Sequence, residues 1–252
     1  MLAPWLSYFA FGFAGIFAGA INAVAGGGTL ISFPVLVAFG IPTVPANATN
    51  AVALWPGSLA SVWGYRVEAK SALRIIAILT IPAVLGAFFG AWALIHTPES
   101  LFRRAVPGLI LLATLLFWFQ PRFKQYAERA QSGRHNRFTA FGLQILISIY
   151  GGYFGAGMGI IMLAVLGLFI EGNIHRLNAI KTWLATIINV VASIFFITSD
   201  AIWLWPGLAL GLGAIVGGYW GARLATKVDP GLIRSLVIAI GLVLTAVFAW
   251  RL

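Results

Sequence analysis

The sequence has no charged residue between Met1 and Tyr65. Over the whole chain, 9% of the 252 residues are charged and 61% are hydrophobic, whereas a soluble domain carries about 25% charged residues. Charges so few and so unevenly placed cannot cover a water-facing surface. The pattern predicts an all-α polytopic membrane protein, in which uncharged segments are joined by short polar loops.

The net charge of +10 does not indicate a nucleic-acid partner. Lys and Arg lie between apolar segments, as in the cytoplasmic loops of membrane proteins, and no basic face remains to follow phosphates. The chain has no cysteine, which excludes thiolate metal sites and thiol catalysis. His96, His135 and His175 fall in predicted loops without metal-site spacing. We therefore expect neither a metal nor a cofactor.

Apolar stretches organise the chain. A helix rises about 1.5 Å per residue and needs about 20 residues to cross ~30 Å of hydrocarbon. Residues 29–40 and 157–170 are too short for this, and each accompanies a cluster of glycines. The stretches lie near residues 5–25, 29–40, 47–65, 72–95, 104–119, 139–154, 157–170, 178–198, 202–225 and 232–250.

The two short stretches occupy equivalent positions of an internal repeat. When the chain is shifted along itself without gaps so that Gly26 falls on Gly157, Gly28 falls on Gly159. We call this the repeat shift. It also pairs Asn47 with Asn178, Gly86 and Gly90 with Gly217 and Gly221, and Leu101 and Arg103 with Leu232 and Arg234. The sequence therefore predicts a first membrane repeat over residues 1–119, a basic loop over 120–138 and a second repeat over 139–252.

The loop charges predict the orientation. The basic residues of the loop are Arg122, Lys124, Arg129, Arg134 and Arg137, against Glu128 alone. Basic loops stay in the cytoplasm, so this loop is expected inside and both termini outside. Each half has five segments, an odd number, and the halves should therefore be inverted relative to each other. Arg103 and Arg104 run against this scheme, because it places them outside.

Inverted repeats with a broken segment at matching positions are typical of secondary transporters. Glycines release the backbone from the helix, and the half-helix that follows directs free N–H groups and a positive dipole end into the protein, where they can bind an anion. The alternative is that glycines only allow close helix packing. We favour packing for the pairs Gly86-xxx-Gly90 and Gly217-xxx-Gly221, and a binding site for the clusters before the short stretches.

Polar residues near these breaks complete the predicted site. Lys181 is the basic residue that we assign to a span, in its first helical turn, and it either faces the site or extends to the interface. If Lys181 faces the site, its charge favours an anionic substrate. No Asp or Glu lies deep in a segment, which argues against carboxylate-based binding of a cation or proton. Ser58 and Asn189 are equally compatible with interhelical hydrogen bonding. The candidate substrate-binding residues are Asn22, Gly26, Gly27, Gly28, Thr29, Asn47, Thr49, Asn50, Gly155, Gly157, Gly159, Asn178, Lys181 and Thr182.

Several motifs carry a family resemblance. They are Asn22-Ala23-Val24-Ala25-Gly26-Gly27-Gly28-Thr29-Leu30, then Pro34, Ala48-Thr49-Asn50 and Pro56-Gly57-Ser58, with the weaker copies Gly155-Ala156-Gly157-Met158-Gly159 and Asn178-Ala179-Ile180-Lys181. Over nearly the whole chain the sequence resembles the TauE/SafE family of sulfite exporters. The resemblance implies a transporter of the bacterial inner membrane that moves sulfite, organosulfonates or similar sulfur-containing oxyanions, often as an exporter.

Two other function classes stay open. An anion channel could use the same site to line a pore. A membrane-embedded enzyme would need a converging nucleophile, base or metal site, and no Ser, His and acid set is predicted at a common depth. The expected partners are a small anion and the lipid bilayer, and a homo-oligomer is compatible with the sequence.

Overall fold

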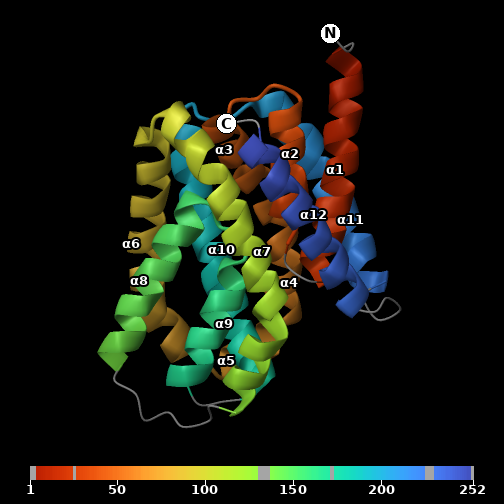
Figure 1. Cartoon of the computed structure of the whole chain (residues 1–252). Helices are drawn as coiled ribbons and strands as arrows, with labels where there is room; N and C mark the ends of the chain where they lie inside the picture. Colours follow the sequence, from red (N-terminus) through yellow and green to blue (C-terminus); the bar gives the residue numbers. More distant parts are fainter. Residues whose placement is uncertain (1–3, 25–26, 130–136, 171–172, 225–229, 251–252) are drawn as a thin grey trace.

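Figure 1 shows the computed structural model, which describes residues 4–24, 27–129, 137–170, 173–224 and 230–250. Within these residues the regular structure is entirely helical, which confirms the predicted all-α class. The elements are α1 (Pro4–Val24), α2 (Thr29–Ala38), α3 (Thr43–Leu54), the 3-10 turn η1 (Trp55–Gly57), α4 (Ser58–Gly64), α5 (Arg66–Lys70), α6 (Leu73–His96), α7 (Glu99–Arg129), α8 (Arg137–Tyr153), α9 (Met158–Phe169), α10 (Ile174–Thr198), α11 (Leu204–Leu224) and α12 (Pro230–Trp250).

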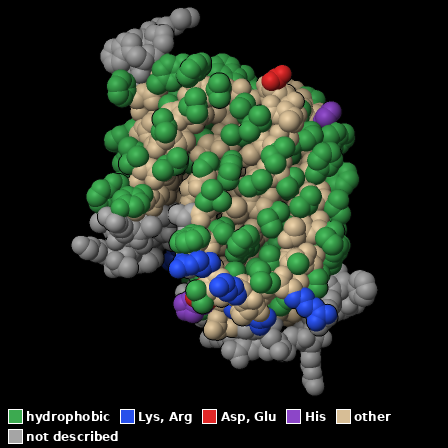
Figure 2. Space-filling view, turned by 180° about the vertical axis from the view of Figure 1, so that it is seen from behind, with side chains coloured by type: hydrophobic (Ala, Val, Ile, Leu, Met, Phe, Trp, Pro, Cys, Tyr) green, Lys and Arg blue, Asp and Glu red, His purple; other side chains and the backbone are tan. Residues whose placement is uncertain are grey.

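Many of these helices suit a membrane. Within the described residues, the segments long and apolar enough to cross a bilayer are Leu73–His96, Glu99–Phe123, Ile174–Thr198 and Gly231–Trp250. Shorter apolar helices are Ser7–Asn22, Thr29–Ala38, Met158–Phe169 and Leu204–Trp220. Hydrophobic side chains cover the middle of the surface in Figure 2, and charged side chains gather toward its ends.

The two ends of the molecule carry different charges (Figure 2). Arg66, Lys70 and Arg74 lie where α5 is followed by α6. From there α6 runs for 24 residues, about 36 Å at the α-helical rise, and it ends at His96, just before Glu99. We call these two places the basic end and the Glu99 end.

The helix boundaries follow the repeat shift. It carries Thr43, the first residue of α3, onto Ile174, the first residue of α10, and it likewise superposes the starts of α6 and α11 and those of α7 and α12. The packing also follows it, because α1 packs against α11 and its repeat equivalent α8 packs against α6. The inverted placement of the halves across a membrane stays a prediction.

Glycines permit this packing. An added Cβ would lie 2.1 Å from the Ile149 carbonyl oxygen at Gly90, and 1.9 Å from that of Ile16 at Gly217. Real Cβ atoms do not approach so closely, so only glycine lets the backbones of α6 and α8, and of α1 and α11, meet in this way. A Cβ added to Gly86 would lie 2.6 Å from the Ile145 carbonyl oxygen of α8. The packing interpretation of these glycines is therefore confirmed at Gly86, Gly90 and Gly217.

Two boundaries differ from those expected. The apolar stretch 47–65 is divided into α3, η1 and α4, because Pro56 has no N–H group to continue the α-helical ladder. Its repeat equivalent α10 has no proline and runs unbroken for 25 residues. At the predicted loop 120–138, α7 continues to Arg129: the polar segment after residue 120 is rich in good helix formers.

Candidate functional site

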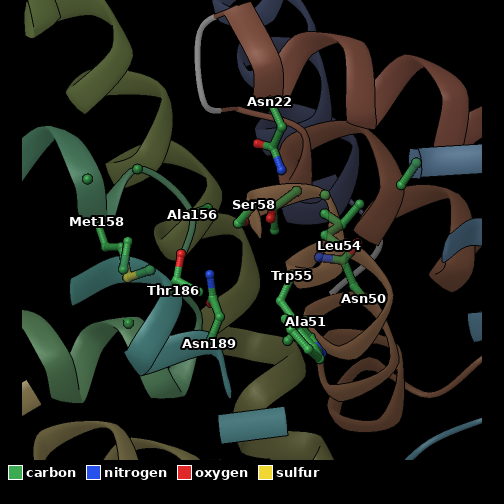
Figure 3. A pocket seen from close by; sticks show the side chains of 18 of the residues that line it. Asn22, Asn50, Ala51, Leu54, Trp55, Ser58, Ala156, Met158, Thr186 and Asn189 are labelled. Carbon is green, nitrogen blue, oxygen red and sulfur yellow. The ribbon is translucent and has the colours of Figure 1, made fainter. Parts of the chain in front are cut away.

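A cavity of about 220 Å³ lies between the two glycine breaks. Its walls come from the end of α1, the start of α2, the helices α3, α4 and α10, the connection from α8 to α9, and one face of α11. Figure 3 shows polar side chains from both halves, among them Asn22, Asn50, Ser58 and Asn189, around this space. The cavity therefore joins residues that are far apart in the sequence.

Two helical faces related by the repeat form opposite parts of the wall. In each half the lining positions include i, i+1, i+4, i+5 and i+8, the spacing of one side of a helix. In the first half they are Asn50, Ala51, Leu54, Trp55 and Ser58, and in the second half they are Lys181, Thr182, Ala185, Thr186 and Asn189. The repeat shift carries each member of the first set onto its partner in the second. The second face is the more polar of the two.

Lys181 supplies the positive charge. Among the described residues that line the cavity it is the single charged side chain. It lies seven residues after the start of α10, about 10 Å along the helix. Its Nζ donates to Asn178 Oδ1 at 3.0 Å, and Asn178 Nδ2 donates to the Ile174 carbonyl oxygen at 2.9 Å. Asn178 thus holds the ammonium group from behind and does not itself line the cavity.

Asn50 is held in a similar way in the first half. Its side chain is buried, and its Oδ1 accepts from the hydroxyl of Ser32. This hydroxyl is also 3.1 Å from the carbonyl oxygen of Gly28. Because Oδ1 is occupied, the donor end of the Asn50 amide is left for the cavity. The repeat equivalents Asn50 and Lys181 therefore present one neutral donor and one cationic donor.

Two predicted residues of α3 face elsewhere. Asn47 Nδ2 donates to the carbonyl oxygen of Tyr153 at 2.8 Å, so its amide joins α3 to the end of α8. Thr49 Oγ1 accepts from the backbone N–H of Trp203 at 2.9 Å. Both side chains are buried. They fix α3 against the second half and do not contribute to the cavity wall.

The first break is closed by a side chain. The backbone N–H of Gly28 donates to Asn22 Oδ1 at 2.9 Å, which spans the turn between α1 and α2. Asn22 and Thr29 line the cavity, whereas Gly27 and Gly28 are packed behind it. An added Cβ at Gly28 would lie 2.3 Å from the carbonyl oxygen of Ala18. Gly26 lies outside the described residues.

The second break is built differently. Gly155 and Gly157 adopt φ values of +79° and +77°, in the left-handed region that favours glycine. The hydroxyl of Tyr150 donates to the carbonyl oxygen of Ala156 at 2.6 Å and spans this turn. Gly155, Gly157 and Gly159 all line the cavity, and the N–H of Gly159 has no hydrogen-bond partner among the described residues.

The structure thus brings together part of the predicted set. The predicted residues that line the cavity are Asn22, Thr29, Asn50, Gly155, Gly157, Gly159, Lys181 and Thr182. Those placed outside its wall are Gly27, Gly28, Asn47, Thr49 and Asn178. Sequence reasoning did not select Thr186, and it left Ser58 and Asn189 undecided. Helical spacing from Asn50 and Lys181, applied to both halves at once, would have found all three.

Comparison with known proteins identifies the family. The family model described as sulfite exporter TauE/SafE matches residues 11–248 of the chain. The chain belongs to the TauE/SafE family. The apolar helices of the structure and the membrane transporters among the relatives both support a multi-pass membrane protein.

Three relatives illustrate the similarity of this TauE/SafE member to bacterial proteins. A probable membrane transporter protein of Haemophilus influenzae is 29% identical over 92% of this chain and 90% of its own length. The probable membrane transporter protein ORF9 of Sinorhizobium sp is 26% identical over 92% and 88%. The probable membrane transporter protein YfcA of Escherichia coli K12 is 24% identical over 93% and 86%. No solved structure matches the chain significantly.

Proposed function

We propose that this TauE/SafE protein is a secondary transporter that moves a small sulfur-containing oxyanion, such as sulfite or an organosulfonate, across the bacterial inner membrane, as an exporter. The cavity between the two breaks is its substrate site. The observation that carries the proposal is the combination of Lys181 with neutral donors in that cavity. No carboxylate is among the described residues that line it.

The positive charge in the cavity supports an anionic substrate. An ionisable side chain within a membrane-spanning helix is costly and usually serves a substrate or ion path. The ammonium group of Lys181 donates to the neutral amide oxygen of Asn178 and not to a carboxylate. This contact therefore leaves the positive charge uncompensated. A bound anion would supply the missing negative charge and would take the remaining ammonium hydrogens.

The neutral groups support an oxyanion in particular. Several oxygen atoms on one substrate can each accept a hydrogen bond, and the cavity wall offers donors from both halves: the amides of Asn50 and Asn189, the hydroxyl of Thr182 and the backbone N–H of Gly159. The volume of about 220 Å³ is below the ~300–1,000 Å³ of pockets for drug-sized ligands. This size suits a small ion better than a large metabolite.

Binding to purified protein tests the proposal. Lys181→Met keeps the length of the side chain and removes its charge. A charge-assisted hydrogen bond contributes about 1.5–3 kcal/mol, so we expect the affinity for sulfite, or for the preferred small sulfonate, to fall roughly ten- to hundredfold. Isothermal titration would measure the change. Lys70→Met, which removes an exposed lysine at the basic end, serves as the control and should bind as the parent does.

Two further measurements complete the test. Counterflow of labelled substrate in proteoliposomes separates a carrier from an anion channel, because only a carrier exchanges substrate across the membrane by a saturable route. Single cysteines at Lys70 and His96 report the orientation, since the basic end should be reached from the cytoplasm and the Glu99 end from outside. Parent-like sulfite affinity in Lys181→Met would mean that the lysine is only an interfacial anchor.

A further inference from the structure

The cavity is symmetric in its two helical faces but asymmetric where α1 and α8 meet it. On one side, Gly19 and Asn22 of α1 line the wall together with small residues of α11. The repeat shift carries these two positions onto Tyr150 and Tyr153 of α8, and neither tyrosine lines the cavity. A glycine and an asparagine therefore leave space on one side, where two aromatic rings occupy the equivalent places on the other.

The side of the cavity lined by α1 faces the basic end. Arg176 Nη2 donates to the Ser71 carbonyl oxygen at 3.3 Å, so α10 begins at the basic end, and its 25 residues carry it to the Glu99 end. Helix α11 then runs back. Helix α1 is parallel to it, because Gly12 meets Gly213 and, further along, Gly19 meets Ala214 and lies near Gly218. Gly19 and Asn22, near the end of α1, therefore lie toward the basic end.

The tyrosine side faces the Glu99 end. Helix α6 begins at the basic end, and α8 is parallel to it, because Gly86 meets Ile145 and Gly90 meets Ile149 and Tyr153. Tyr153, the last residue of α8, has its hydroxyl 3.4 Å from Thr97 Oγ1 in the connection that leads to Glu99. The two sides of the cavity thus lead to opposite ends of the molecule.

The tyrosines are fixed by contacts with both halves. The hydroxyl of Tyr150 donates to the carbonyl oxygen of Ala156, a residue of the cavity wall. The ring of Tyr153 packs edge-on against Phe102 at a centroid distance of 5.5 Å, and its carbonyl oxygen accepts from Asn47. Tyr150 also packs against both hydrophobic clusters of the core. These contacts fix Tyr150 beside the cavity wall and Tyr153 near the Glu99 end.

A second set of contacts joins two elements at the same end. The carboxylate of Glu99 accepts from the backbone N–H of Thr43, from Thr43 Oγ1 at 2.7 Å and from the backbone N–H of Val44 at 3.0 Å. A carboxylate at the first turn of a helix is favoured by the helix dipole. The α6–α7 connection is thereby tied to the start of α3, the helix that carries Asn50.

We propose that Tyr150 and Tyr153 form the gate that closes the cavity toward the Glu99 end, and that the structure is the state open toward the basic end. This inference rests on the proposed function only in taking the cavity as the transport site. Substrate enters or leaves past Gly19 and Asn22 in this state. Passage to the other side requires the two rings to move away from Ala156 and Phe102.

Thiol labelling from each side tests the gate. The chain has no native cysteine, so Ala185→Cys places one thiol in the centre of the second lining face. We expect a small, membrane-impermeant, sulfonate-bearing thiosulfonate to label it from the basic end and not from the Glu99 end. Single cysteines at Lys70 and His96 define the two sides. Adding Tyr150→Ala should raise labelling from the Glu99 end at least tenfold.

The control is Tyr8→Ala, which removes an exposed tyrosine of α1 away from the cavity and should leave labelling one-sided. Where Tyr150→Ala does not yield folded protein, Tyr150→Phe keeps the ring, loses the bond to Ala156 and should give a smaller increase. Equal labelling of Ala185→Cys from both sides overturns the gate. Unchanged one-sided labelling when Tyr150→Ala or Tyr153→Ala is added to it, in folded protein, overturns the gate as well. The readout uses no transport substrate, so a failed sulfite assay with one-sided labelling rejects the substrate and not the gate.

Discussion

The two glycine breaks occupy equivalent places in the repeat, yet they need glycine for different reasons. At the first break, Gly28 has a φ of −55°, and neither Gly27 nor Gly28 is left-handed. A Cβ added to Gly27 would lie 2.8 Å from the Phe117 ring, and one added to Gly28 would lie 2.3 Å from the Ala18 carbonyl oxygen. At the second, Gly155 and Gly157 take left-handed backbone conformations, and a Cβ on Gly159 would meet Lys181 only at an ordinary contact distance of 3.6 Å. The first break is a packing site and the second is a conformational one.

Each break is also spanned by one side chain that reaches six residues ahead. Asn22 accepts from the N–H of Gly28 in the first, and Tyr150 donates to the carbonyl oxygen of Ala156 in the second. The two breaks, at equivalent positions under the repeat shift, are therefore held by different chemistry. The amide leaves the cavity open on its side, and the phenol closes the other.

The largest effect is expected at the first break, from Gly28→Ala. The new methyl group would lie 2.3 Å from the carbonyl oxygen of Ala18, and backbone cannot move aside as a flexible side chain can. We expect a loss of about 3 kcal/mol, at the upper end for overpacked sites, measured as the thermal unfolding midpoint in detergent. Gly108→Ala, with no atom within 4 Å of its added Cβ, should be neutral. Equal midpoints for both variants would remove the packing explanation.

A smaller effect is expected at the second break, from Gly157→Ala. A left-handed conformation costs a residue with a Cβ about 1–2 kcal/mol, and Asn tolerates it better than Ala. Gly157→Asn should therefore destabilise the protein less than Gly157→Ala, as followed by the same unfolding midpoint. At Gly28, where space is limiting, Asn should be worse than Ala. If Ala and Asn ranked in the same order of destabilisation at Gly28 and at Gly157, the distinction between the two breaks would be contradicted.

The side chains that span the breaks should contribute about 1 kcal/mol each, the usual net value of a hydrogen bond. We expect Asn22→Ala and Tyr150→Phe to lower the unfolding free energy by similar amounts.

Asn22→Asp keeps the acceptor for Gly28 but adds a negative charge to the cavity wall. It should therefore keep the stability and weaken sulfite binding, which titration of the purified variant would show. Unchanged sulfite affinity in Asn22→Asp would place the anion away from α1.

The smallest effect is expected from Gly159→Ala. The added methyl group meets Lys181 at an ordinary contact distance, so the unfolding free energy should change by less than about 0.5 kcal/mol, as at unconstrained positions. Crowding of the lysine stem should lower sulfite affinity by less than tenfold. A large loss of stability would show that Gly159 is needed by the backbone, as Gly157 is.

Helical spacing could predict the shared face of Asn50 and Lys181, but not which of two neighbouring residues would reach the cavity. Asn47 and Asn50 are three positions apart, and both were expected in the site. Asn47 meets the end of α8 and binds Tyr153 instead, because a helix from the other half covers that part of α3. Asn178 is likewise used to hold Lys181. A neighbouring element made the choice at Asn47, whereas Asn178 is engaged by a partner three residues ahead in α10 itself.

The sequence by itself determined the helical class, the duplication, the two breaks and the single lysine near them. Each of these depends on composition, on local backbone chemistry or on a comparison of the chain with itself. Only the tertiary structure decided that Gly27 and Gly28 lie behind the wall, that Ser58, Thr186 and Asn189 lie on it, and that Tyr150 and Tyr153 lie beyond its edge. The physical reason is that cavity walls are set by contacts between helices distant in sequence, and the two faces that form this one lie a whole repeat apart along the chain.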